Sequence, residues 1–377
     1  MSLRSPSIAF AFGSTLAAAL WPGVGWGQRP GPILEVPPGF TVDLIAGDLP
    51  SPVALTFGPD GRLYVALRDA GRVVALEDID GDRAIDRVVT AVDGLARPSD
   101  LAFRNGELWV LDSARVVRVR GPFGDGTGGR EEIALDSLLA GGPPAASFAF
   151  FAGGVLVAIG AECETCPAGN LGSGIVVNLV AEDGEPRHWS RGLRRVAAMA
   201  VQPSTGVLWA TETGPARWGS DLPADELNTI RAGRHYGWPY CYGNRIPTPE
   251  FADPARCDRT EPPVLTLPAG SAPTGIVFYG EDAFPSGYRG DAFIALAGSV
   301  AGPTFAEPRV ARIRFVDGRP VALENFVTGW VGEAGRLGRP SHLAVGPGGA
   351  LYVSDDLAGR VWRVSWVSGD IGEDEGG

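Results

Sequence analysis

The sequence has 377 residues, of which 54 are glycine and 32 are proline. Because both residue types interrupt regular helices, this share excludes a long-helix or coiled-coil fold. Hydrophobic residues (45%) and charged residues (20%) stand at values typical of packed proteins, which excludes a largely disordered chain. The net charge is −12, and arginine supplies all of the lysine-plus-arginine total, so the charge balance disfavours nucleic-acid binding.

The N-terminus has the pattern of a secretory signal peptide. Met1 to Arg4 is a short basic start, residues 8–20 are apolar, and Gly25 and Gly27 give the small-residue spacing of a cleavage site. We therefore expect a signal peptide over residues 1–27 and a secreted or periplasmic mature protein. The alternative is an N-terminal membrane anchor, but the apolar run is shorter than the ~20 residues that span a bilayer. We expect no membrane span in the mature chain.

The rest of the chain repeats one pattern of short strands. A second strand of the type Gly-x-Leu-aromatic begins at Gly61, Gly106, Gly206 and Gly349. Unit starts near residues 52, 98, 146, 196, 273 and 340 give six units, most of them at the spacing of four-stranded propeller blades. This predicts an all-β, six-bladed β-propeller over residues 28–368, with inserted loops on one face, chiefly residues 221–268. A pair of β-sandwiches is the alternative, and residues 369–377 are expected to form an acidic tail.

An acidic loop is expected between two of the units. Asp78, Asp80 and Asp82 alternate along the chain, with Asp86 close behind. Alternate carboxylates can converge on Ca²⁺, although the spacing is not that of an EF-hand loop. The loop is either a structural calcium site or a solvated turn.

The start of each inner strand is expected to face the central channel of the propeller. Arginines stand just before three of these strands, and guanidinium groups pair with carboxylates in bidentate fashion. The channel mouth is therefore suited to a planar, multiply carboxylated ligand, and salt bridges between blades are the alternative. The matching channel positions are Asp100, Ser147, Ala198, Gly275 and His342, and the arginines are Arg97, Arg194, Arg195 and Arg339.

The four cysteines fit an extracytoplasmic protein. Cys163 and Cys166 form a C-x-x-C pair, and Cys241 and Cys257 enclose one loop. Of three possible connectivities, we expect the pairing of each cysteine with its near neighbour. A redox role for the C-x-x-C pair is the alternative, whereas Pro167 stands where a c-type haem attachment needs histidine.

Several motifs in the second half of the chain carry a family resemblance. They are Gly-Leu-Arg at 192–194, the Gly-Pro-ending run at 205–215, Asp-Glu-Leu-Asn at 225–228, the Tyr-Gly-Trp-Pro run at 233–243, residues 288–293, Gly-Arg-Pro at 338–340 and residues 351–356. With these motifs the chain resembles the pyrroloquinoline quinone (PQQ)-dependent glucose and sorbosone dehydrogenases, closest to the sorbosone branch. The resemblance implies an extracytoplasmic six-bladed propeller that oxidises a sugar with PQQ and Ca²⁺ and passes electrons to a separate acceptor.

The resemblance also implies a set of site residues. Backbone carbonyls of Gly214 and Pro215 match ligands of the calcium that holds the quinone, a role that needs no side chain. Asp225 and Tyr236 fall in a second, structural calcium region. The matches to cofactor-contacting positions are Arg194, Arg195 in place of an asparagine, Arg339, and Arg309 in place of a lysine.

The chain departs from the family at its histidines. The catalytic histidine would stand in the segment 142–147, which contains none, and two further family histidines are replaced by Gly270 and Ala297. His342, at a channel position, is our hypothesis for a relocated base. Two functions therefore remain in view: a PQQ-dependent sugar dehydrogenase, or a non-catalytic propeller that binds a carbohydrate or a protein.

Overall fold

The computed structural model describes residues 32–121, 123, 129–135, 145–164, 166, 173–179, 186–215, 223–251, 253–299, 306–333 and 335–367. These residues belong to one unit that begins at Pro32. The predicted signal peptide and acidic tail lie outside the described residues. Among the described residues, no helix is both long enough and apolar enough to cross a membrane.

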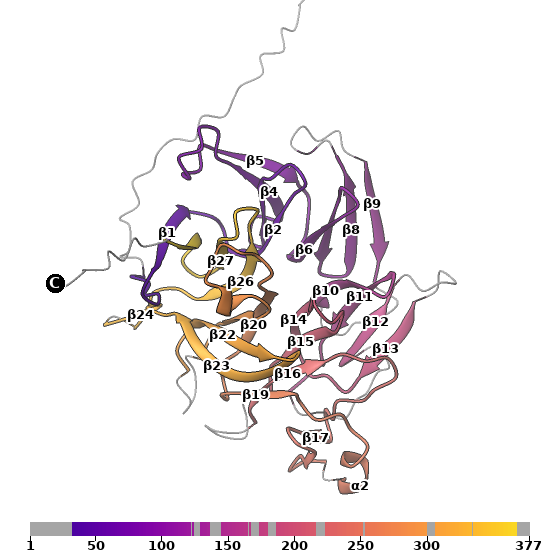
Figure 1. The fold of residues 1–377 in the computed structure, drawn as a ribbon. Coiled ribbons are helices and arrows are strands. Elements are labelled where there is room, and N and C mark those ends of the chain that lie inside the picture. Colours follow the sequence, from indigo (N-terminus) through magenta and orange to yellow (C-terminus); the bar gives the residue numbers. More distant parts are fainter. Residues whose placement is uncertain are drawn as a thin grey trace, which may run out of the picture. The chain divides into compact units, whose positions relative to one another are not determined.

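Six four-stranded antiparallel sheets form the molecule (Figure 1). Blade 1 contains β2 (Pro52–Phe57), β3 (Leu63–Leu67), β4 (Arg72–Glu77) and β5 (Arg87–Val92). Blade 2 contains β6 (Pro98–Arg104), β7 (Glu107–Asp112), β8 (Arg115–Arg120) and β9 (Arg130–Ala134). Blade 3 contains β10 (Ala145–Phe151), β11 (Gly154–Ile159), β12 (Ile175–Asn178) and β13 (Arg187–Arg191).

The second half of the chain supplies the remaining three sheets. Blade 4 contains β14 (Val196–Val201), β15 (Leu208–Glu212), β16 (Asp225–Thr229) and β19 (Leu265–Leu267). Blade 5 contains β20 (Pro273–Phe278), β21 (Ala292–Leu296), β22 (Arg309–Val316) and β23 (Arg319–Val327). Blade 6 contains β26 (Pro340–Val345), β27 (Leu351–Asp355), β28 (Arg360–Trp366) and, from the other end of the chain, β1 (Phe40–Ala46).

Strand β1 closes the ring, because it pairs antiparallel with β28. The inner strands contact one another in the order β2, β6, β10, β14, β20, β26 and back to β2. Radial closure of this kind leaves no open sheet edge between the first and last blades. The predicted six-bladed propeller is confirmed, and the sandwich alternative is wrong.

The predicted unit starts coincide with the inner strands, which begin at residues 52, 98, 145, 196, 273 and 340. Each inner strand has a register shift directly after its first residue. Such a bulge turns the chain in the same way in every blade. The channel positions after the shift are therefore equivalent: Ala54, Asp100, Ser147, Ala198, Gly275 and His342.

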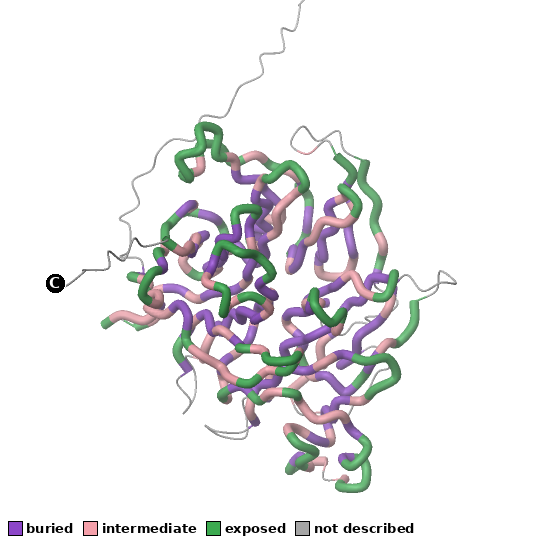
Figure 2. Tube along the Cα trace, in the orientation of Figure 1, coloured by how far each residue is buried: buried purple, intermediate pink, exposed green. Residues whose placement is uncertain are grey.

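Burial follows the inner and middle strands, while the outer strands are more exposed (Figure 2). All five residues of β3 are buried. Its side chains alternate between two cores: Tyr64 and Ala66 pack toward blade 2, and Leu63, Val65 and Leu67 pack toward blade 6. A strand that is buried on both faces needs apolar residues at every position. The repeated glycines before the second strands have φ from +68° to +79°, a turn conformation that glycine adopts without strain.

An inserted segment separates β16 from β19 and differs from the prediction in its bounds. Residues 225–229 and 265–267, expected inside the insertion, are the third and fourth strands of blade 4, so the inserted segment is 230–264. It carries β17 (Cys241–Tyr242), β18 (Ile246–Pro247) and the short helix α2 (Pro254–Cys257). The acidic start of β16 concealed the strand, because four of the other five third strands begin with arginine.

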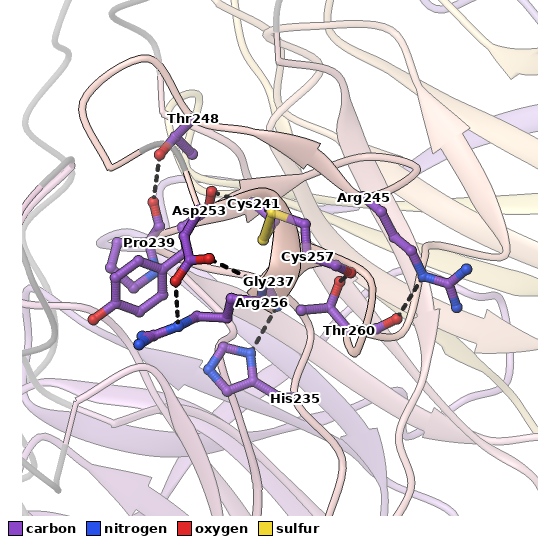
Figure 3. The surroundings of a disulfide bond; sticks show 11 residues. His235, Gly237, Pro239, Cys241, Arg245, Thr248, Asp253, Arg256, Cys257 and Thr260 are labelled. Carbon is purple, nitrogen blue, oxygen red and sulfur yellow. Dashed lines mark hydrogen bonds and ion pairs between the residues drawn. A yellow bond between two sulfur atoms is a disulfide. The ribbon is translucent and has the colours of Figure 1, made fainter.

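The Cys241–Cys257 disulfide closes this segment over a separation of 16 residues (Figure 3). Asp253 caps α2 by accepting a hydrogen bond from the Arg256 backbone N–H at 3.1 Å. The guanidinium of Arg256 lies 3.8 Å above the ring of Tyr240, a cation–π contact. The disulfide and these local contacts stabilise the outer part of the insertion, while Ile230 and Tyr236 at its start belong to the hydrophobic core between blades 3 and 4. The second predicted disulfide, Cys163–Cys166, is also confirmed.

Smaller elements join the blades. A hairpin of β24 (Val331–Gly332) and β25 (Gly335–Arg336) connects blade 5 to blade 6, and a 3-10 turn, η2 (Ser286–Tyr288), precedes β21. The inner strands all begin on one face of the propeller, which we call the mouth face. The loops that precede them lie on this face, together with the turns between second and third strands.

Candidate functional site

Buried carboxylates at the ends of three second strands hold the loops of the mouth face. Each accepts a hydrogen bond from a backbone N–H just before an inner strand, and so fixes the chain at an arginine that the sequence predicted there. The pairs are Asp112 with Arg97 N–H (2.7 Å), Glu212 with Arg194 N–H (2.6 Å) and Asp355 with Arg339 N–H (2.9 Å).

The arginine side chains have different partners. Arg339 binds Asp356 in bidentate fashion, with both contacts at 2.6 Å, and Arg68 of blade 1 lies 3.8 Å from the same carboxylate. The predicted alternative of salt bridges between blades is therefore present at this point. Arg194 donates to the backbone oxygens of Thr213 (2.9 Å) and Gly214 (2.8 Å), while its buried Nε has no hydrogen-bond partner.

The third strands begin opposite the ends of the second strands, and arginine occupies this position in four blades. Arg115 faces Asp112 in blade 2, where its Nε donates to the carboxylate at 3.0 Å. In blade 4 the register instead places Glu226 opposite Glu212. A carboxylate thus stands where four of the other five blades carry arginine, while blade 3 has Ile175 there. The four arginines are Arg72, Arg115, Arg309 and Arg360.

Blade 4 therefore buries three carboxylates together: Glu212 (6% exposed), Asp225 (1%) and Glu226 (7%). The Asn228 amide donates to Glu212 at 3.0 Å and to Glu226 at 3.1 Å, and its own Oδ1 has no partner. Burial, and next the neighbouring Glu226, raise the pKa of Glu212 well above its usual value. Burial also raises the pKa of Glu226 and brings that of Asp225 to about 6.

A void of about 20 Å³ lies against this cluster. It has room for a single small ion or water, and the carboxylates of Glu212 and Glu226 in its wall have the donor chemistry that Ca²⁺ prefers. The predicted metal residues Gly214, Pro215 and Tyr236 border it. The full lining is Arg194, Glu212, Gly214, Pro215, Pro223, Ala224, Glu226, Tyr236, Trp238, Cys241, Tyr242 and Thr248.

Two predicted metal residues have other contacts. Asp225 accepts the backbone N–H groups of Gly214 (2.9 Å) and Ala272 (2.7 Å), so it ties the Gly214 loop to the start of blade 5. The Tyr236 hydroxyl donates to the backbone oxygen of Thr229, and burial raises the pKa of Tyr236 to about 12. Glu212 and Glu226, which the sequence reasoning missed, line the void together with Tyr236, whereas Asp225 does not. The signal was available, because four third strands begin with arginine and that of blade 4 begins with Asp-Glu.

His342 lies among polar groups of the channel. Its Nδ1 accepts the Leu55 backbone N–H at 3.3 Å, and its Nε2 lies 3.7 Å from Asp100 Oδ1. The other oxygen of Asp100 accepts from Ser147 Oγ at 2.9 Å and from the Phe148 N–H at 3.0 Å. These contacts assign the imidazole proton to Nε2. The hypothetical base thus links blades 6, 1 and 2.

The remaining predicted cofactor residues lie on the mouth face. Arg195 is exposed. Arg309 donates to the Glu307 backbone oxygen at 3.2 Å, its buried Nε has no partner, and burial lowers its pKa. At Ala297, where the family has a histidine, Arg336 donates to the backbone oxygen at 2.7 Å. Residues 142–144, which the family comparison singled out, lie outside the described residues.

The acidic loop, which was expected between blades, instead lies within blade 1, at the turn between β4 and β5 and away from this site. Ligand atoms of Asp78, Asp80 and Asp86 all lie within 4.8 Å of one another, and the three residues are exposed. Asp82, the third predicted ligand, instead accepts from the Ala84 N–H at 2.8 Å. A groove of about 460 Å³ beside Asp78 extends to Tyr352 of blade 6. Calcium binding by this loop stays a prediction.

Comparison with known proteins assigns the chain to a family. The model for glucose/sorbosone dehydrogenase matches residues 174–363, which is half of the chain. The chain belongs to the glucose/sorbosone dehydrogenase family. A model for a domain of unknown function matches residues 32–146. The family assignment confirms the predicted resemblance, and with it an oxidoreductase ancestry for the propeller.

Individual relatives agree with the assignment. An aldose sugar dehydrogenase of Escherichia coli is 29% identical over 184 residues, which is 47% of this chain and 43% of that protein. The chain spans between 43% and 62% of the lengths of the three curated relatives it matches.

Two solved structures show the same fold. The first is the calcium structure of a Trichoderma reesei carbohydrate-active enzyme of family AA12, with a TM-score of 0.72 and 19% sequence identity over 90% of this chain and 98% of that one. The second is the PQQ-bound aldose sugar dehydrogenase of Streptomyces coelicolor, with a TM-score of 0.58 and 20% identity over 88% of this chain and 99% of that one.

Proposed function

We propose that this protein is a sugar oxidoreductase that binds PQQ on the mouth face, with Ca²⁺ at the carboxylate cluster of blade 4. The observation that carries the proposal is that cluster itself: three buried carboxylates beside a void, with no arginine opposite Glu212. Buried charges of like sign need a counter-charge. A hard divalent cation meets that need. Among proteins of similar fold, the calcium structure of the AA12 enzyme and the PQQ-bound aldose sugar dehydrogenase supply precedents for the ion and for the quinone.

Each residue has a stated role in this proposal. Glu212, Glu226 and the backbone oxygens of Gly214 and Pro215 would hold Ca²⁺. Arg194, Arg339 and Arg309 would orient the carboxylates of the quinone, since two of them carry a buried Nε without a partner. The bound quinone supplies the acceptor for the hydride of a sugar C–H bond. A separate electron acceptor would then reoxidise it.

His342 would accept the proton of the sugar hydroxyl. To do so the imidazole must release either the Leu55 N–H at Nδ1 or its own Nε2 proton toward Asp100. A base of this kind contributes about 10²- to 10⁴-fold in rate. The His342→Ala variant should therefore lose sugar oxidation by such a factor and still bind the quinone. Undiminished oxidation would remove His342 from the mechanism.

A second function is a non-catalytic propeller that binds a carbohydrate or protein at the mouth face. The specific observation in its favour is that both nitrogens of His342 already have neighbours, while Gly270 and Ala297 replace two family histidines. In this second function the arginines and the carboxylate cluster of blade 4 would still bind the ligand.

Calorimetric titration of the purified protein with PQQ separates these readings. We expect uptake in the presence of Ca²⁺, loss of uptake in chelator, and weaker uptake by Arg194→Gln. An absence of PQQ binding in Ca²⁺ would overturn the first function. If PQQ binds, an aldose panel with an artificial electron acceptor tests oxidation, and binding without turnover would favour the second function.

We also propose that residues 1–27 direct export, so that the mature protein is secreted or periplasmic. Expression of the full chain in a bacterial host, followed by N-terminal sequencing of the exported fraction, tests this. We expect a mature chain that begins at Gln28. Retention of the intact N-terminus in the membrane fraction would show an anchor instead.

A further inference from the structure

The Cys163–Cys166 disulfide lies beside the arginine that the proposed function places at the ligand. The residue between the two cysteines that the structure describes is Glu164, and its Oε1 lies 3.3 Å from Arg194 Nη2. The Arg194 side chain is 12% exposed, whereas that of Glu164 is 42% exposed. A half-exposed carboxylate from blade 3 thus reaches the buried guanidinium of the loop that begins blade 4.

The backbone joins the same two segments. The Trp238 indole N–H donates to the Glu164 backbone oxygen at 3.3 Å, and the Ala161 N–H donates to the Arg194 backbone oxygen at 2.6 Å. Trp238 belongs to the inserted segment and is 6% exposed. Glu164 is therefore held through its main chain by the insertion and by its neighbouring disulfide, while its side chain holds Arg194.

Three contacts fix the orientation of the Arg194 guanidinium. Nη1 donates to the oxygens of Thr213 and Gly214, and Nη2 faces Glu164. Without Glu164, the Nη2 end would lose its contact with blade 3 and the side chain could rotate. A guanidinium that is held in one plane pairs with a carboxylate at lower entropic cost than one that is free to rotate.

The two disulfides suit different tasks. Cys241–Cys257 spans 16 residues and Cys163–Cys166 spans only 3. The entropy that a disulfide removes from the unfolded chain increases with the length of the loop that it closes. The shorter bridge therefore stabilises the fold less. Its distinct effect is local, because it fixes the backbone on both sides of the segment that carries Glu164.

We propose that Glu164, held by the Cys163–Cys166 bridge, is the positioning residue that fixes Arg194 for an anionic ligand on the mouth face. This inference rests on the proposed function for the identity of that ligand. Its physical content, the ordering of Arg194 by Glu164, is independent of whether the ligand is PQQ.

The test compares Glu164→Ala, Glu164→Gln and the double variant Cys163→Ser/Cys166→Ser. Amide hydrogen exchange of the segment that contains Ala161 reports the order of the Arg194 loop without any ligand. We expect faster exchange in Glu164→Ala and in the cysteine double variant. Glu164→Gln should restore protection, because the amide oxygen still accepts from Arg194. Unchanged exchange in Glu164→Ala, with all chains folded, would overturn the proposal.

Titration with PQQ and Ca²⁺ provides the second readout. We expect about tenfold weaker binding in Glu164→Ala, the value of one charge-assisted hydrogen bond, and a smaller loss in Glu164→Gln. Tighter binding in Glu164→Ala would show that Glu164 competes with the ligand, and would overturn the positioning role. Failure of the unaltered protein to bind PQQ would defeat the proposed function, while the exchange experiment would still decide on Glu164.

Glu132→Ala is the matched control. Glu132 is 41% exposed and pairs with both Arg115 and Arg130 at 2.8 Å in blade 2, so the variant removes at least as many ion-pair contacts as Glu164→Ala, but away from the mouth loop of blade 4. We expect neither exchange at Ala161 nor PQQ affinity to change. A change equal to that of Glu164→Ala would mean that any lost surface ion pair has this effect, and the proposal would fall.

Discussion

Blades 2 and 4 use the same backbone geometry with opposite charge. In both, the carboxylate that ends the second strand accepts an N–H from the loop before the inner strand. In blade 2 the facing residue is Arg115, which neutralises Asp112. In blade 4 the facing residue is Glu226, which adds a second negative charge to Glu212.

This difference separates a position that only stabilises from one suited to binding. A buried carboxylate with an arginine partner is complete within the protein, whereas two facing carboxylates are complete only with a proton or an external cation. The inserted segment reinforces this, since the Gly243 N–H donates to Glu226 at 2.9 Å and covers the pair. The candidate site is thus marked by a single change of charge, from arginine to glutamate, at one repeated position of the strand register.

The largest effect is expected from breaking the complete pair. Asp112 is fully buried as a side chain and accepts from the N–H groups of Ala96 and Arg97 and from Arg115. In Asp112→Asn the neutral amide faces donors and leaves Arg115 with only the more exposed Glu132 as its counter-charge. We expect the free energy of unfolding to fall by about 3 kcal/mol, measured by urea denaturation.

Asp282→Asn provides the control for that loss. Asp282 is 81% exposed and pairs with Arg289 at the surface, so its removal should cost less than about 1 kcal/mol. If the two variants lose equal stability, the carboxylate of blade 2 has no special structural role, and the contrast with blade 4 disappears.

The next effect concerns the incomplete pair. In Glu226→Gln one of two facing charges is removed, so the protein should become more stable than the unaltered chain in chelator. The unaltered chain should gain about 2.7 kcal/mol at a Ca²⁺ concentration 100-fold above Kd, and the variant should lose most of that gain. Thermal unfolding with Ca²⁺ and with chelator measures both. An equal Ca²⁺ response in the variant would place the ion elsewhere, for example at Asp78, Asp80 and Asp86.

Much of this could be predicted from the sequence, because it rests on repetition. The glycine turns and the spacing of unit starts predicted the six blades and the equivalence of Asp100 with His342. The local disulfide pairs were predicted from spacing, and Arg194 and Arg339 from their place before inner strands.

The rest depended on register, which the sequence pattern did not fix. Residues 225–229 were expected in a loop, because an acidic Asp-Glu start hides a third strand. The sequence analysis therefore did not predict that Glu226 lies opposite Glu212. The contact of Glu164 with Arg194 joins residues 30 positions apart across two blades, and no periodicity predicts such a pair.

The smallest effect extends the comparison to blade 6, where Asp355 occupies the equivalent position. Its carboxylate accepts from Trp330 Nε1 (2.9 Å), Arg339 N–H (2.9 Å) and Ala358 N–H (2.8 Å). Arg360 lies opposite Asp355 in the register, as Arg115 lies opposite Asp112, but the Arg360 guanidinium lies 5.7 Å from the centre of the Trp362 ring. Burial accordingly raises its pKa above the usual 3.8. Blade 6 is intermediate between blades 2 and 4: hydrogen bonds satisfy the carboxylate, but no full counter-charge does.

A raised pKa means that the folded protein binds the proton more tightly than the unfolded chain. The contribution of Asp355 to stability is therefore greatest below about pH 4 and is lost as pH rises through its folded pKa. Asp355→Asn does not titrate there, so the stability of the variant relative to the unaltered chain should improve as pH rises above about 4. Thermal unfolding of both proteins in chelator across this range measures the difference. Parallel profiles would mean that hydrogen bonds alone compensate the buried charge, and blade 6 would then belong with blade 2.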